Sequence, residues 1–182
     1  LIDFPPFGNG YTIPINLDKL IKLAFFLSNS FDPSKLKIIC SFHPSFQKTS
    51  FHQIAQVLSY DSNLNLMQPD LETTERNLIF SQVDIIICSS SSVGFNHLIN
   101  NKHALILANS KGENFSFLDD IFTRTYSEFE DIYNAVDLII SNNKGYSSSI
   151  CEPINTLNPL IIDSLIPENI HRYKIKNALL KV

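Results

Sequence analysis

The sequence has few of the features that mark metal sites, nucleic-acid binders and membrane spans. Its three cysteines follow no metal-ligand spacing, and it contains no Asp-x-Asp pair. The formal net charge of -4 argues against nucleic acid as a partner, because phosphate backbones require clustered lysine and arginine. Every apolar run is far shorter than the roughly 20 residues that a spanning helix needs. We therefore expect no metal, no cofactor and no transmembrane segment.

What is present is the composition of a folded globular protein. The chain has 182 residues, of which 44% are hydrophobic and 18% are charged, and one domain is the simplest organisation. Cys40 and Cys88 lie in apolar runs, where cysteine acts as a small buried hydrophobe, and this favours a reducing cytoplasm. The chain starts at Leu1 with neither a basic leader nor an initiator Met. We expect it to be a fragment.

Strand-like and helix-like segments alternate along the chain. Residues 1–15 are rich in proline and glycine, which predicts a linker or interdomain segment, and residues 16–182 are expected to form the domain. Apolar runs predict strands at 36–42, 63–67, 84–88, 104–108 and 122–126. Helical spacing and capping residues predict helices from Asn16 to Asp32-Pro33 and at 50–58, 71–83, 93–101 and 127–136, the last opened by a capping box at Ser127 and Glu130. This alternation predicts an α/β domain with a parallel sheet covered on both faces.

Two of the predicted strands are followed by residues that can bind a phosphate. The run at 36–42 is followed by His43-Pro44, and the run at 84–88 is followed by Ser89-Ser90-Ser91-Ser92-Val93-Gly94. Hydroxyls and free N–H groups at a helix N-terminus attract anions, and histidine can transfer a proton near neutral pH. Gly94 would let a ligand approach the backbone. The alternatives are a plain helix cap for the serines and a structural turn for the histidine. Ligands of parallel sheets bind beyond the carboxyl ends of the strands, which favours a shared site.

The first turn of the predicted helix at 71–83 carries two carboxylates, Glu72 and Glu75. Acids in this position are ordinary partners of the helix dipole, but they can also accept hydrogen bonds from ribose or a base. Glu72 is the preferred candidate and Glu75 the reserve. Gly8-x-Gly10 lacks both the third glycine and the preceding strand of a dinucleotide fingerprint, so we assign it no role.

The combination of Ser41-Phe42-His43-Pro44, Glu72 and Ser89–Ser92 resembles the His-Pro and Ser-Ser/Thr motifs of bacterial sialyltransferases. The stretch from Gln82 to Phe95 is also similar to capsule polysaccharide Kdo transferases. The resemblance spans about residues 36–108. It implies the Rossmann-like, three-layer C-terminal half of a two-domain (GT-B) glycosyltransferase that transfers sialic acid or Kdo from a CMP-sugar to a surface glycan, either lipooligosaccharide or capsule.

The resemblance also implies a role for each matching residue. His43, beside Pro44, would contact the CMP phosphate and assist its departure; two of the three serines Ser90, Ser91 and Ser92 would hold that phosphate; Glu72 would bind ribose or cytosine. In these families the catalytic base lies in an acidic triplet of the N-terminal domain, and this chain has no such triplet. It would therefore need an N-terminal domain or a partner chain for turnover.

The expected location is the cytoplasm, at the inner face of the inner membrane, with peripheral membrane association left open. The lack of Asp-x-Asp disfavours the metal-dependent class of glycosyltransferases. Two other readings stay open: a GT-B protein that uses a UDP-sugar or a CDP-alditol, and a non-catalytic nucleotide-binding module or subunit.

Overall fold

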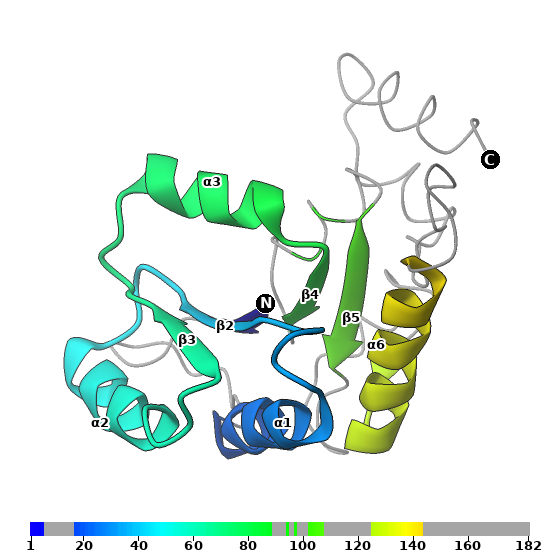
Figure 1. Ribbon diagram of the computed structural model, residues 1–182. Coiled ribbons are helices and arrows are strands. Elements are labelled where there is room, and N and C mark those ends of the chain that lie inside the picture. Colours follow the sequence, from blue (N-terminus) through cyan, green and yellow to red (C-terminus); the bar gives the residue numbers. More distant parts are fainter. Residues whose placement is uncertain (6–16, 89–93, 95–96, 98–101, 108–124, 144–182) are drawn as a thin grey trace, which may run out of the picture.

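The computed structural model describes residues 1–5, 17–88, 94, 97, 102–107 and 125–143 (Figure 1). Within these ranges six strands form one sheet in the order β3-β2-β1-β4-β5-β6, and each neighbouring pair is parallel. The predicted α/β class with a parallel sheet is confirmed, and the architecture is consistent with a Rossmann-like fold. The strands are β1 Ile2–Phe4, β2 Ile38–Phe42, β3 Leu64–Met67, β4 Ile85–Cys88, β5 His103–Leu107 and β6 Thr125–Tyr126.

Helices cover the sheet on both faces. Figure 1 shows α3 on one face and α1 and α2 on the other, with α6 on the same side as α1. The described helices are α1 Leu17–Ser30, α2 Lys48–Leu58, α3 Thr73–Gln82 and α6 Phe129–Asn143. None of these helices is both long and apolar enough to cross a membrane. The predicted helix at 93–101 lies largely outside the described residues.

The first strand corrects the prediction for the start of the chain. Residues 1–15 were expected to form a linker, but Ile2–Phe4 is β1, a buried strand between β2 and β4. Its register places Ile2 opposite Cys40 and Ile87. The linker prediction is therefore wrong for residues 2–4. This three-residue strand directly precedes Pro5-Pro6, and it is buried because neighbouring strands lie on both sides of it. Residues 6–16 lie outside the described part of the chain.

Two smaller predictions also need correction. The strand predicted at 104–108 begins one residue earlier, because the buried His103 is the first residue of β5. The last described helix starts at Phe129 and continues to Asn143, so Ser127 lies two residues before it and the helix outlasts the predicted end at 136. Propensity sets such boundaries only to within a few residues, because packing extends or trims helix ends.

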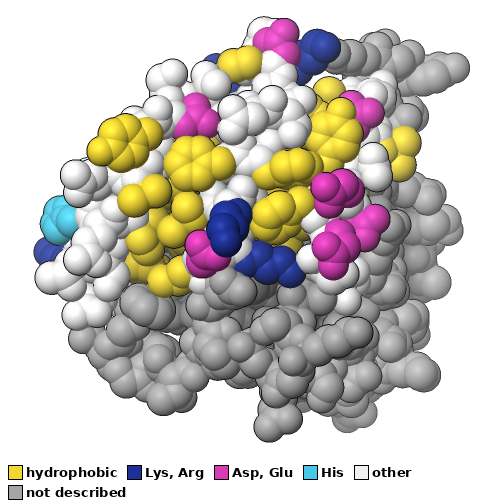
Figure 2. All heavy atoms as spheres, turned by 90° about the horizontal axis from the view of Figure 1, so that it is seen from below, with side chains coloured by type: hydrophobic (Ala, Val, Ile, Leu, Met, Phe, Trp, Pro, Cys, Tyr) yellow, Lys and Arg dark blue, Asp and Glu magenta, His cyan; other side chains and the backbone are white. Residues whose placement is uncertain are grey.

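The main hydrophobic core lies between the sheet and the helices α1 and α2. Phe42 is fully buried, stacks on Phe4 of β1 at 4.6 Å, and meets Phe46 and Phe51 edge-on at 5.1 and 5.0 Å between ring centroids. The buried side of α1 consists of residues spaced three or four apart: Leu20, Leu23, Ala24 and Leu27. Figure 2 looks onto the outer side of this helical layer, where hydrophobic side chains remain visible between charged ones. These contacts hold the strands whose ends form the candidate site.

The strand order creates a switch point between β1 and β4. From β1 the chain builds outward to β2 and β3, crosses the sheet through α3, and returns to pair β4 with the other side of β1. In parallel α/β sheets, ligands commonly bind beyond the carboxyl ends of the strands at such a switch point.

Candidate functional site

His43 lies at the carboxyl edge of the sheet, directly beside β1. Its backbone N–H donates to the Phe4 carbonyl at 2.9 Å, so the residue after β2 is fastened to the last residue of β1. The His43 carbonyl accepts from the Phe46 N–H at 2.8 Å, and the ring atom Nδ1 accepts from the Ser45 N–H at 3.1 Å. Because Nδ1 is an acceptor, the neutral ring carries its proton on Nε2. His43 therefore presents a hydrogen-bond donor next to the switch point.

The surroundings of His43 keep its ring uncharged when no ligand is bound. Partial burial lowers the pKa of His43 below its ordinary value, and the Arg76 guanidinium lowers it further. An anion placed against Nε2 has the opposite effect, because a neighbouring negative charge favours the imidazolium. Pro44, the next residue, is exposed and restrains the turn.

The serine run begins on the other side of β1. Cys88 is the last residue of β4, and Ser89 follows it in the sequence. Residues 89–93 lie outside the described part of the chain, so the placement of Ser90, Ser91 and Ser92 stays a prediction. Since β2 and β4 both flank β1, their ends are two strand spacings apart, about 10 Å.

Gly94, predicted to let a ligand approach, has a packing role in the structure. It is buried, and a Cβ atom added to it would lie 2.6 Å from Cys88 Sγ and 3.2 Å from Ile106 Cδ1. Both neighbours belong to the sheet, so Gly94 permits a close approach between its own segment and β4 and β5. Close helix-to-strand packing is one of the tasks that glycines perform in nucleotide-binding α/β folds.

The two carboxylates at the start of α3 line a cavity. Glu72 is the residue before the helix, with φ -52° and ψ 140°, and its side chain makes no capping hydrogen bond. Glu72 and Glu75 border a cavity of about 1300 Å³ under α3, which Met67 and Gln68 also line at the end of β3. His43 does not line this cavity. The structure therefore places Glu72 beyond the end of β3, which is next to β2 and three strand positions from β4.

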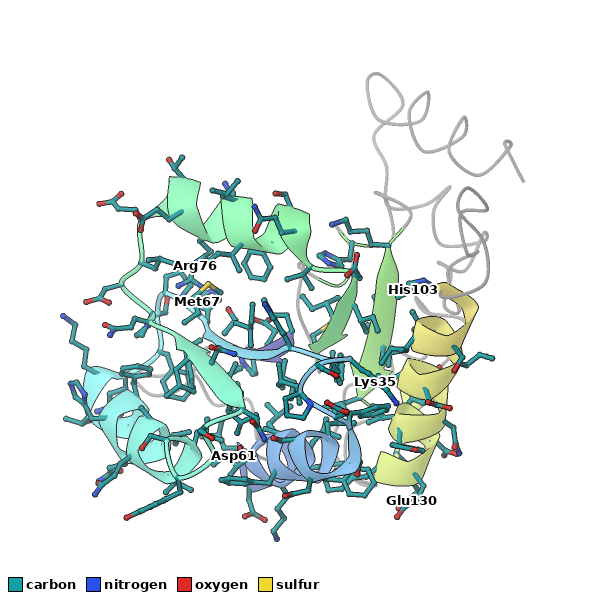
Figure 3. All side chains as sticks on the ribbon, in the orientation of Figure 1. Lys35, Asp61, Met67, Arg76, His103 and Glu130 are labelled. Atoms are coloured by element: carbon teal, nitrogen blue, oxygen red, sulfur yellow. The ribbon has the colours of Figure 1, made fainter. Side chains whose placement is uncertain are left out.

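Arg76 is a residue of the site that sequence reasoning missed. It is 8% exposed, although α3 has the composition of a surface helix, and Figure 3 shows it on the sheet-facing side of α3. Its guanidinium donates to Ser41 Oγ and to the Phe42 carbonyl, and also to carbonyls beyond β3. Burial lowers the pKa of Arg76 and the Asp3 carboxylate raises it. A single arginine in a polar helix carries no sequence signal for such burial.

The other described histidines lie away from this edge. His97 is buried near the start of β4, where its Nε2 lies 3.3 Å from the Val83 carbonyl. Lys102 donates to the Ser81 and Val83 carbonyls at the end of α3, and His103 opens β5. His52 is exposed on α2. Among the residues that the structure describes, no three His, Cys, Asp or Glu side chains are grouped to hold a metal.

The fold is a parallel α/β domain, and His43 lies at the switch point of its sheet. Comparisons of the chain with protein-family models, with curated proteins and with solved structures find no match. The function must therefore be argued from the site itself.

Proposed function

We propose that this chain is the donor-binding domain of a CMP-sugar glycosyltransferase of the two-domain type. The observation that carries the proposal is the hydrogen bond from the His43 N–H to the Phe4 carbonyl, which fixes a histidine donor at the switch point. The serine run leaves β4 on the far side of the same strand. A phosphate between them would receive hydrogen bonds from an imidazole and from hydroxyls, which are charge-assisted and hence strong.

The chemistry that fits these groups is departure of a nucleotide from a sugar. The bond between the anomeric carbon and the phosphate oxygen breaks, and the acceptor hydroxyl forms the new bond while a base of another domain takes its proton. Charge accumulates on the leaving phosphate, where His43 donates through Nε2 and becomes more basic as the charge grows. Glu72 would accept hydrogen bonds from ribose hydroxyls or from the cytosine amine. The sugar would be sialic acid or Kdo, and the acceptor a bacterial surface glycan.

A nucleotide titration tests the proposal. Isothermal titration calorimetry of the 182-residue chain in EDTA should show binding of CMP, and weaker binding of UDP and CDP, which carry a second phosphate. Preference for UDP or CDP would favour the UDP-sugar or CDP-alditol reading, and binding only after Mg²⁺ or Mn²⁺ is added would contradict the metal-free site. Absence of binding by all three nucleotides would refute the proposal.

The serines are tested with a pair of ligands that differ only in the phosphate. Replacing Ser91 and Ser92 together by alanine should weaken CMP binding by roughly 1.5–3 kcal/mol for each lost hydrogen bond to the charged group. Cytidine binding should change little, because cytidine lacks the phosphate. An equal loss for both ligands would indicate that the serines only cap a helix.

A further inference from the structure

The buried guanidinium of Arg76 connects the segments that follow β2 and β3, which we call the exits of these two strands. Nη1 of Arg76 donates to Ser41 Oγ at 3.3 Å and to the Phe42 carbonyl at 2.9 Å, both at the end of β2. Nη2 donates to the Gln68 carbonyl at 2.9 Å and to the Pro69 carbonyl at 3.1 Å, both just beyond β3. These four hydrogen bonds involve only neutral acceptors, and the Asp3 carboxylate interacts with the guanidinium electrostatically.

The two exits that Arg76 joins lead to the two residues that we propose bind the ligand, His43 and Glu72. Phe42 is the residue before His43, and Pro69 lies three residues before Glu72. Arg76 also reaches Glu72 through its own helix, because its backbone N–H donates to the Glu72 carbonyl at 2.9 Å. A shift of the Arg76 side chain would therefore change the position of His43 relative to Glu72.

We propose that Arg76 is a positioning residue for the nucleotide: it joins the exits of β2 and β3 and so sets the spacing between His43 and Glu72. This inference rests on the proposed function, in which His43 takes the phosphate and Glu72 the nucleoside. A ligand that is held at two points gains affinity only while the two points match its length. Arg76 also places a positive charge behind the phosphate position without touching the ligand.

Only arginine suits this arrangement. Its planar fork directs parallel N–H groups from two nitrogens, whereas lysine is a compact charge on a flexible stem. Lysine at position 76 would keep the charge but could not hold both exits in one geometry. Buried carbonyls that lose a partner are costly, so an exit released from the arginine would rearrange to find water or another donor.

The test compares CMP with cytidine in the variants Arg76→Lys and Arg76→Gln of the 182-residue chain. The ratio of the cytidine Kd to the CMP Kd should fall by at least about tenfold in both variants, because the phosphate and the nucleoside no longer meet their groups together. A general loss of folded protein would weaken both ligands equally and leave this ratio unchanged. Lys102→Met is the matched control, since Lys102 anchors the opposite end of α3 through the Ser81 and Val83 carbonyls; its ratio should match the original chain.

The outcomes separate this inference from the proposed function. If the original chain does not bind CMP, the proposed function fails. If it binds CMP and Arg76→Lys keeps the full ratio, the positioning role fails. If both variants are unfolded, hydrogen exchange on the original chain tests the positioning role instead. CMP should then slow the Phe46 and Leu71 amides, one at each exit, by the same factor. Protection at one exit alone would overturn the inference.

Discussion

At the level of single residues, one ring nitrogen of His43, Nδ1, accepts a hydrogen bond, and the other, Nε2, can donate one to a ligand. The Ser45 N–H fixes Nδ1 as an acceptor at 3.1 Å, and the backbone of His43 is bonded to β1. These two hydrogen bonds hold the ring in one tautomer and one orientation. Such a donor contributes little to binding a neutral group and much to stabilising a growing negative charge.

His43→Ala should therefore affect catalysis more than binding. In the proposed two-domain enzyme, kcat should fall by about 10²-fold or more, with a much smaller change in the donor KM. Steady-state kinetics beside a melting curve measures both effects. If His43 were only a turn residue, the melting temperature would drop while turnover per folded molecule stayed intact.

Gly94 allows a second prediction at this scale. Gly94→Ala places a Cβ atom 2.6 Å from Cys88 Sγ, and overpacking of this kind costs about 1–3 kcal/mol of unfolding free energy. Denaturant unfolding measures the cost. In a Cys88→Ala background the sulfur is gone, and the same substitution should cost less. An equal cost in both backgrounds would show that backbone freedom, not the contact with sulfur, requires glycine there.

At the level of elements, the sequence was informative where a strand or helix is defined by its own residues. The runs ending at Phe42 and at Cys88 predicted β2 and β4 because continuous apolar residues suit strands buried on both faces. Strand β1 was missed, since three residues before two prolines have no periodicity and are buried only because β2 and β4 lie beside them. Once β1 is present, Gly8-x-Gly10 follows a strand after all, although it still lacks the third glycine.

The residues of the candidate site also differ in whether the sequence predicts them. His43 and Glu72 could be selected because each follows a predicted strand end, whereas Arg76 could not. Its burial depends on carbonyls of β2 and of the segment after β3, which are distant in sequence and become neighbours only in the sheet. Contacts of this kind depend on the pairing of β2 with β3, which the sequence alone does not specify.

The start of β4 provides a prediction about acid stability. His97 is 5% exposed, and burial followed by the charge of Lys102 lowers its pKa from 6.5 to about 4. The folded state therefore disfavours the protonated ring, and between these two values the unfolded chain binds more protons. Stability should fall as the pH drops from about 6.5 to 4, with a loss from this residue of roughly 3 kcal/mol.

The measurement is urea unfolding at several pH values. His97→Gln, which keeps a donor for the Val83 carbonyl, should lose less stability than the original chain between pH 7 and pH 4.5. His52→Gln, at an exposed position of α2, is the control and should follow the original curve. Parallel curves for all three proteins would contradict the assignment of His97.

At the level of the whole molecule, two places are candidates for a ligand. One is the carboxyl edge at the switch point, with His43 beside β1, and the other is the cavity of about 1300 Å³ under α3. The strand order favours the first, because ligands of parallel α/β sheets bind at the switch point. Under the proposed function, the phosphate would lie at the edge, and the cavity, which Glu72 lines, would take the nucleoside.

The most direct test uses the histidines as reporters in an NMR titration with CMP and with cytidine. The chain has five histidines: His43 at the carboxyl edge, His97 and His103 at the opposite side of the sheet, His52 on α2, and His171 outside the described residues. CMP should shift the ring signals of His43 and raise its pKa, whereas cytidine should leave that pKa unchanged. A chain that binds CMP with the His43 signals and pKa unaltered would place the phosphate elsewhere and contradict the proposed donor site.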